Sequence, residues 1–224
     1  MGTLQAALNY CASEGYILAA PSVKLPEKPA TTQRALTRPE AARLIRAARS
    51  IDAHHVARFI LVCLYTGTRS AATLELRLDG PSVRGGWIDL ERGVLYRRGS
   101  GERDTAKRRT PAPVPRQLLA HARRWRAKGQ TYAVEWRGLR VGSIKTAWRS
   151  TVTAAKLGWK PTRHTLKHTA ISWAMENGLR IEDAAQYFGT SADTIRSTYW
   201  HLSPHYLAEA VALIENRKRP DKRA

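Results

Sequence analysis

PTRHTLKHTAISW, residues 161–173, sets two histidines and a lysine within five positions, shortly after a proline. At about 100° per residue, the spacing of a helix places His164, Lys167 and His168 on one arc. The opposite arc is apolar and is expected to face the core, with Leu166, Ala170 and Trp173. The three polar side chains form a metal site, a solvated helix face, or a cluster that binds an anion.

A zinc site is the least supported of these three. Two histidines at i, i+4 can bind zinc, but the metalloprotease version needs a glutamate directly after the first histidine. Thr165 occupies that position, and Lys167 between the two ligands would repel the cation. We therefore expect no metal and no cofactor, and the solvated face and the anion cluster both stay open.

The charge of the whole chain favours an anionic partner. Of 224 residues, 38 are Lys or Arg and 18 are Asp or Glu, which gives a formal net charge of +20. Such an excess is typical of nucleic-acid binding, although charge kept only for solubility is the alternative. Arginine dominates RRGSGERDTAKRR (97–109) and HARRWRAK (121–128), and its planar fork matches two phosphate oxygens at once. A basic membrane helix fits poorly, because these arginines lie between predicted elements.

Cys11 and Cys63 lie far apart, each in an apolar stretch, which predicts two buried free thiols rather than a disulfide. No basic segment followed by an apolar run opens the chain, and no run of 18 apolar residues occurs. We therefore expect no membrane partner and a cytoplasmic location.

Helix and strand signals predict an α+β fold that is mostly helical, with a small antiparallel three-stranded sheet. LTRPEAARLIRAARS (36–50) has Thr37 as N-cap and Glu40 three residues later, a capping-box pattern. HHVARFILVCLYTGTRS (54–70) predicts a buried helix interrupted at Gly67. Over residues 86–115, short segments that alternate in polarity or are β-branched are separated by glycine-rich turns. This pattern predicts the sheet, with GSGERDTAK as a hairpin tip.

After Pro115 the pattern is helical. We expect helices over 116–128, about 143–156, 163–177, 182–188, 192–200 and 204–216. Gly178 and Gly189 are placed to end helices, and Ser191 to begin one. The expected organisation is a terminal helix (1–19), a proline-bearing linker (20–35), a main domain (36–216) and a basic disordered tail (217–224).

Segments far apart in the sequence complete a family pattern. TGTR supplies Arg69, and AKRRTPAPVP supplies Lys107, eight residues before Pro115. HTLKHT supplies His164 and Lys167, and TYWHLSP supplies Tyr199. In this order they resemble the catalytic domain of tyrosine recombinases, the phage integrase family, over roughly residues 36–215.

The resemblance implies a site-specific DNA recombinase. The hydroxyl of Tyr199 would attack a DNA phosphodiester, giving a 3′-phosphotyrosine and a free 5′-hydroxyl, and a second hydroxyl would reseal the strand without ATP or metal. Cations would stabilise the charge of the transition state, and Lys107 on a mobile hairpin would act as general acid. The implied catalytic set is Arg69, Lys107, His164, Lys167, Thr190 and Tyr199, with support from His168, Trp200 and His201. DNA contacts are expected from Arg97, Arg98, Arg103, Arg108, Arg109, Lys145 and Arg163.

Two of these positions depart from the family pattern. Lys167 stands at the second arginine and keeps the charge without the bidentate fork. Thr190, in GTS, stands at the histidine or tryptophan position and offers one neutral hydroxyl. The alternative is therefore a catalytically impaired integrase fragment that only binds DNA, or an RNA or other polyanion binder.

The family also implies partners and a cellular setting. Integrases place a core-binding domain before the catalytic one, and residues 1–19 would be the last helix of such a domain. The expected partners are double-stranded DNA and further copies of the chain, as a tetramer on DNA. A bacterial or phage origin, in a mobile element, and association with the nucleoid would follow.

Overall fold

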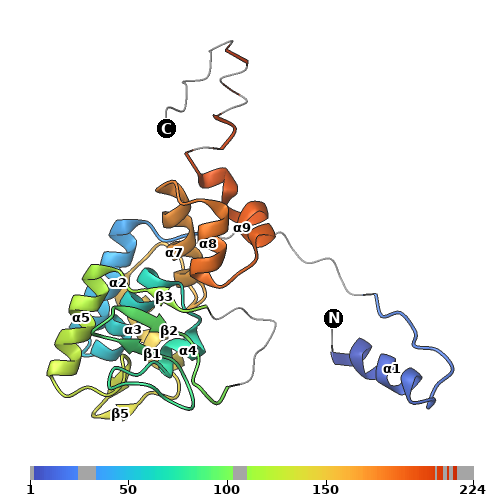
Figure 1. Ribbon diagram of the computed structural model, residues 1–224, viewed down its shortest axis with the longest axis horizontal. Coiled ribbons are helices and arrows are strands. Elements are labelled where there is room, and N and C mark those ends of the chain that lie inside the picture. The colour runs from blue at the N-terminus through green and yellow to red at the C-terminus, as the bar shows by residue number, and fades with distance from the viewer. Residues whose placement is uncertain are drawn as a thin grey trace. The chain divides into compact units, whose positions relative to one another are not determined.

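The computed structural model describes residues 3–24, 34–102, 110–204, 206–208, 211 and 214–215 of the chain. It has two compact units, residues 1–32 and 33–224. The first unit contains α1 (Thr3–Ser13), which buries none of its residues. The second unit contains the other helices and the strands of the described residues (Figure 1). The predicted domain boundaries at residues 19, 35 and 216 stay predictions.

The second unit opens with three helices, α2 (Arg38–Ser50), α3 (His54–Thr66) and α4 (Ser70–Leu74). The predicted capping box is present, because Thr37 Oγ1 accepts from the amide of Glu40 and Glu40 Oε2 accepts from the amide of Thr37. Helix α3 ends at Gly67, which adopts the left-handed conformation with φ 59°. An ordinary side chain there would be strained, so glycine is the natural residue for this turn.

The predicted three-stranded sheet is confirmed. Its strands are β1 (Trp87–Asp89), β2 (Val94–Tyr96) and β3 (Ala112–Pro113), antiparallel and in the order β1-β2-β3. Ile88 pairs with Leu95 across the first two strands, and both side chains are buried. Part of the predicted hairpin tip, residues 103–109, lies outside the described residues.

The rest of the described chain is mainly helical, as predicted. Its elements are α5 (Arg116–Ala127), β4 (Glu135–Trp136), β5 (Leu139–Arg140), α6 (Lys145–Ala155), α7 (Thr165–Glu176), α8 (Ile181–Phe188), α9 (Ala192–Tyr199) and the 3₁₀ turn η1 (Trp200–Leu202). Ser191 caps α9 by accepting from the amide of Thr194 at 3.2 Å, and Gly189 ends α8 in the left-handed conformation. The β4–β5 hairpin was not predicted. The predicted helix over 204–216 falls partly, and the tail over 217–224 wholly, outside the described residues.

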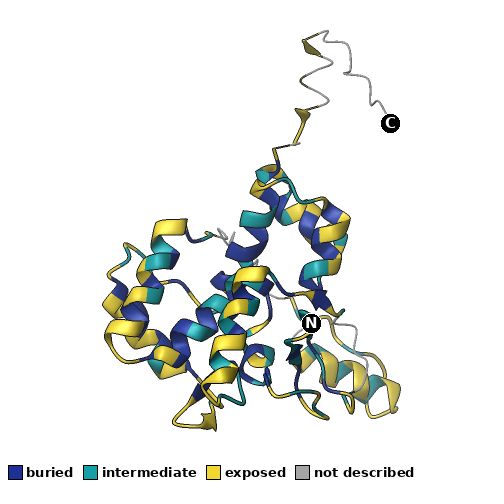
Figure 2. Ribbon diagram, turned by 60° about the vertical axis from the view of Figure 1, so that its left-hand side comes forward, coloured by how far each residue is buried: buried dark blue, intermediate teal, exposed yellow. Residues whose placement is uncertain are grey.

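Two apolar clusters form the interior of this unit. The larger one gathers around α3, which packs against α2, α6 and α7, and it takes in the buried faces of the sheet. The smaller one joins α7, α8 and α9, which gather at one end of the unit in Figure 1. Figure 2 shows the buried sides of these helices turned toward one another. Helix α7 contributes to both clusters, and the quoted segment therefore links the two halves of the domain.

The two cysteines differ in burial. Cys63 is buried and its pKa is raised by burial to about 12, whereas Cys11 is only half-buried, so the prediction of two buried thiols was wrong for Cys11. Both are free. Within the described residues, no helix has the length and apolarity needed to cross a membrane, and no three His, Cys, Asp or Glu side chains are grouped as metal ligands.

Candidate active site

The turn between α3 and α4 forms one wall of a small cationic cavity. Thr66 Oγ1 donates to the carbonyl of Val62 at 2.7 Å and is also hydrogen-bonded to Thr68 Oγ1 at 2.7 Å, which holds the turn in place. Arg69 follows this turn and is exposed. Its guanidinium makes no hydrogen bond or ion pair with the described part of the chain, so its donors are available to a ligand.

Lys167 also lines this cavity. Its side chain is 8% exposed, and Nζ donates to the carbonyl of Phe188 at 3.1 Å. The expectation that Lys167 points away from the core was therefore wrong, because the ammonium is enclosed between α7 and the end of α8. Burial, with the charges of Arg69 and Arg97, lowers the pKa of Lys167 to about 8.

Arg97 lies in the same cavity, and it is one of the residues expected to contact DNA. It is 7% exposed, so its guanidinium is enclosed in the cavity, and the expected contact with DNA stays a prediction. Arg97 comes directly after β2 and two residues after the buried Leu95, so its side chain lies on the same side of the chain as Leu95 and points inward. The cavity has a volume of about 30 Å³ and is lined by Gly67, Thr68, Arg69, Ala72, Arg97, Lys167 and Phe188. Among the described residues that line it, three are cationic and none is acidic.

The two histidines connect this cavity to Tyr199. The rings of His164 and His168 meet edge to face, with centroids 4.5 Å apart. Burial and then the charges of Lys167 and Arg69 lower the pKa of His164, which places it close to both cations. Burial, His164 and Lys167 lower the pKa of His168 to about 4, so this ring is neutral at pH 7. Nδ1 of His168 is hydrogen-bonded to the hydroxyl of Tyr199.

The Tyr199 side chain is closed off from solvent. It is 3% exposed, and burial raises the pKa of its hydroxyl to about 12. The hydroxyl lies by His168, to which it is hydrogen-bonded. The structure thus brings together four predicted site residues. Arg69 and Lys167 line the cavity, His164 lies near both of them, and His168 links His164 to the buried hydroxyl of Tyr199.

The remaining predicted catalytic residues lie around this series. Thr190 is half-buried two residues after Phe188, and its amide donates to the carbonyl of Ala185 at 3.1 Å. Trp200 is half-buried and His201 exposed, both in η1. Lys107 lies outside the described residues, so its role as general acid stays a prediction.

The predicted DNA contacts fall into three groups. Arg103, Arg108 and Arg109 lie outside the described residues, and Arg98 is half-buried after β2. Lys145 is exposed and Arg163 half-buried, and both line a separate groove of about 520 Å³ beside the start of α6. Within the part of the chain that the structure describes, its lining carries four charges and no carboxylate; the charges come from Lys145, Arg149, Lys160 and Arg163. We call these four residues the basic groove. Sequence reasoning missed Arg149 and Lys160 as its members.

Comparison with known proteins agrees with this geometry. No family model matches the sequence. Tyrosine recombinase XerA of Pyrococcus furiosus is 28% identical over 225 residues, which cover 95% of this chain and 74% of the relative. XerA of Thermococcus kodakarensis is 27% identical over 219 residues, covering 92% and 72%.

Solved structures share the fold. The crystal structure of XerA recombinase aligns with a TM-score of 0.58 and 23% identity, over 88% of this chain and 68% of that one. The Tn1549 transposon integrase bound to transposon right end DNA aligns with a TM-score of 0.68 and 14% identity, over 95% and 76%. The architecture is therefore that of a tyrosine-recombinase catalytic domain with its small antiparallel sheet. The chain thus resembles tyrosine recombinases both in its sequence, over 95% and 92% of its length in the two relatives, and in its fold.

Proposed function

We propose that this protein cleaves and rejoins DNA strands at specific sites, through a covalent bond between Tyr199 and a 3′ phosphate. The observation that carries the proposal is the cavity that Arg69 and Lys167 both line, with no acidic residue among the described residues of its lining. Two cations in a confined space repel each other, and an anion between them removes that repulsion. A DNA phosphate is such an anion.

The site supports the chemistry through charge. Attack on a phosphodiester gives a pentacoordinate transition state with added negative charge, and cations already in place stabilise it without reorganising. Arg69 offers a free planar fork and Lys167 a point charge. His164, next to both cations, can donate a third hydrogen bond.

The nucleophile needs a change of position first. With a pKa of about 12, the hydroxyl of Tyr199 is a poor nucleophile while it stays buried on His168. DNA binding would bring α9 and η1 toward the phosphate, where Arg69 and Lys167 lower the pKa of the phenol. We propose that the same movement breaks the bond to His168.

In the chemical step, the phenolic oxygen of Tyr199 forms a bond to phosphorus while the bond from phosphorus to the 5′ oxygen breaks. The phenolic proton passes to Nδ1 of His168 as the movement separates the two groups, so that the oxygen reaches the phosphate as a phenolate. The leaving 5′ oxygen takes a proton from a general acid, for which Lys107 is proposed. Rejoining is the reverse, with a 5′-hydroxyl as nucleophile.

The test is a covalent adduct. Because the target sequence is unknown, nicked duplexes with a randomised centre of about thirty base pairs would be incubated with the full chain, and complexes that survive denaturation would be digested and analysed by mass spectrometry. Phosphonucleotide on Tyr199 is the expected result, and Tyr199→Phe abolishes it. Tyr16→Phe, at an exposed tyrosine outside the site, is the matched control and leaves it unchanged.

A second candidate is a DNA-binding module without cleavage activity. It is favoured by Lys167 at the second arginine position and by the buried hydroxyl of Tyr199. DNA binding without any adduct would support it and exclude the first proposal. The double variant Lys167→Arg with Thr190→His then distinguishes decay, because a gain of adduct from an inert parent shows that these two changes removed the activity.

We also propose assembly of several copies on DNA, as a tetramer. The support is the segment after η1, in which Tyr206, Leu207, Val211 and Ile214 are all exposed apolar residues. Exposed apolar side chains at helical spacing favour docking onto another molecule. Sedimentation of the chain with and without duplex DNA would measure the assembly, and a complex that stays at one protomer per site would exclude it.

A further inference from the structure

We propose that Arg97 is a third cation of the anion site and supplies the guanidinium that position 167 lacks. The inference deepens the proposed function and rests on it, since the anion is taken to be a phosphate. It assigns to a residue directly after β2 a part of the site that the family pattern places on α7.

Three bonds hold the guanidinium of Arg97 in place. Nη2 donates to the carbonyl of Thr66 at 3.0 Å, Nη1 to the carbonyl of Thr110 at 2.8 Å, and Nε to Thr68 Oγ1 at 3.4 Å. Every acceptor is neutral, and no carboxylate of the described residues pairs with Arg97. A buried guanidinium without a counter-ion is costly, so the site is complete only with an anion.

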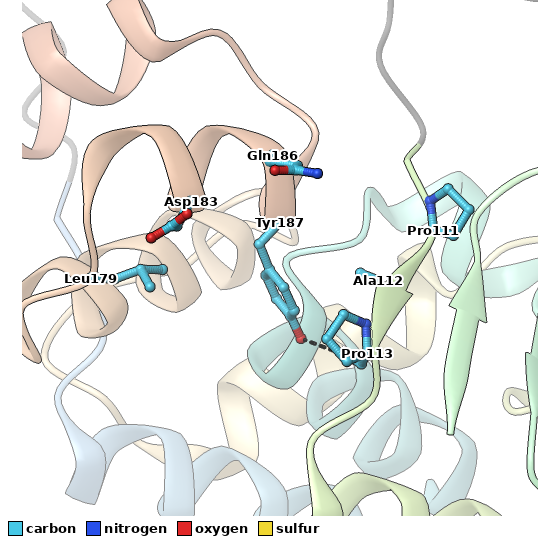
Figure 3. Close-up of a pocket in the computed structure, with 7 residues that line it drawn as sticks. All are labelled: Pro111, Ala112, Pro113, Leu179, Asp183, Gln186 and Tyr187. Atoms are coloured by element: carbon cyan, nitrogen blue, oxygen red, sulfur yellow. Dashed lines mark hydrogen bonds between the residues drawn. The ribbon is translucent and has the colours of Figure 1, made fainter. Parts of the chain in front are cut away.

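The ring of Tyr187 supports Arg97 from the side of α8. The guanidinium carbon lies 5.7 Å from the ring centroid. The hydroxyl of Tyr187 donates to the carbonyl of Tyr65 at 3.1 Å and to that of Pro113 at 3.3 Å. Figure 3 shows this ring pointing from α8 toward β3, with the bond to Pro113 drawn. Arg97 is therefore held by α3, β3 and α8 together.

The position of this fixed guanidinium gives it access to the ligand. Arg97, Arg69 and Lys167 line one cavity of about 30 Å³, the size of one water molecule or of one oxygen of a phosphate. A guanidinium has five N–H donors, and three are engaged, so two remain for such an oxygen. Because three hydrogen bonds already hold the side chain of Arg97, it can offer its two remaining N–H donors without losing side-chain entropy on binding.

The test compares two variants of Arg97 in the full chain without DNA. Arg97→Gln removes the charge and keeps polar reach, and Arg97→Lys keeps the charge. The probes are inorganic sulfate, which stays a dianion across the titration, and the NMR signal of the Lys167 side chain, assigned with Lys167→Arg. We expect Arg97→Gln to weaken sulfate binding by about tenfold and to raise the titration midpoint of Lys167, while Arg97→Lys stays near the wild type.

A purely structural role predicts a different result. Arg97 would then only tie β2 to the α3–α4 turn, and both variants would lower the melting temperature alike while sulfate affinity and the Lys167 midpoint stayed unchanged. That outcome overturns the inference. If neither variant folds, the wild type decides, because sulfate must shift the Arg97 Nε–H signal and the Lys167 signal with the same midpoint. An Arg97 signal that does not respond also overturns it.

The DNA assay separates this inference from the proposed function. Arg97→Gln should slow adduct formation by about a hundredfold, and adding Lys167→Arg should restore part of the rate, since it returns a guanidinium to the site. Sulfate binding that depends on Arg97 without any adduct would leave the anion site standing and remove the proposed cleavage. Cleavage at an unchanged rate in Arg97→Gln would support the proposed function and overturn the role of Arg97.

Discussion

Nδ1 of His168 is hydrogen-bonded to the hydroxyl of Tyr199, in a pocket where Tyr199 is 3% exposed. Because His168 is neutral at pH 7, its Nδ1 can accept a hydrogen bond from the phenol without placing a charge in the interior. The bond joins the first turn of α7 to the last turn of α9. Helix α7 therefore holds the proposed nucleophile, Tyr199, through His168, and the same helix supplies Lys167 to the cavity.

The neutral state of His168 makes the folded protein sensitive to acid. In the folded protein the pKa of His168 is about 4, below the ordinary value of 6.5. The contribution of the neutral ring to the free energy of unfolding is therefore complete above pH 6.5 and is lost as the pH falls toward 4. Between pH 7 and pH 4.5 the wild type should lose about 2 kcal/mol more unfolding free energy than His168→Gln. Urea unfolding of both proteins at the two pH values measures this difference, and equal losses would contradict it.

The ammonium of Lys167 should make DNA binding sensitive to alkali. Its pKa of about 8 means that the free protein loses this charge as the pH rises past 8, and DNA must then bind together with a proton. We expect the affinity for duplex DNA to fall about tenfold between pH 7 and pH 9.5 at constant salt. Lys167→Arg keeps its charge and should remove most of this fall, as fluorescence anisotropy would show. The same fall in both proteins would mean that Lys167 does not face the phosphate.

The basic groove should contact the DNA backbone away from the cavity. Lys145→Gln with Arg163→Gln removes two of its four charges. Each lost phosphate contact lowers the slope of log affinity against log salt by about 1, so the slope should fall by about 2. Arg126→Gln, at an exposed position on α5, is the control and should change the slope little. A slope that falls equally in the control would assign the effect to net charge alone.

Gly67 should tolerate no side chain. An added Cβ would overlap the ring of Phe188 and would also occupy the left-handed conformation. Gly129 has the same kind of conformation, with φ 82°, and open space around it. Gly129→Ala should therefore cost about 1 kcal/mol and Gly67→Ala about twice that or more. Thermal unfolding compares the two, and equal losses would show that Phe188 moves aside freely.

Much of the fold could be predicted because its signals are local. The capping box at Thr37 and Glu40 begins α2, and Gly67 ends α3, as expected from those residue types alone. The β4–β5 hairpin was missed because each strand has only two residues, which is too short for any periodicity. Its turn is made by Arg137 and Gly138, both with positive φ.

The site was harder to predict, because burial is set by elements distant in the sequence. Helical spacing places Lys167 on the polar arc of α7, and only the end of α8 encloses it. Arg97 was read as part of a charged run, although the alternation of its strand gave a signal, because the side of β2 that carries Leu95 also carries Arg97. Tyr199 was found by family pattern, and its burial depends on packing that no pattern contains.

Phe188 joins three features of the site that were described separately. Its ring fills the space left by Gly67, its carbonyl accepts from Lys167, and the chain turns at Gly189 directly after it to reach Thr190. Lys167 and Thr190, the two residues that depart from the family pattern, are therefore both positioned by the end of α8. A designer who wishes to restore arginine at 167 and histidine at 190 would have to redesign the end of α8 as a single block, because the longer guanidinium takes the place of an ammonium fitted to that carbonyl.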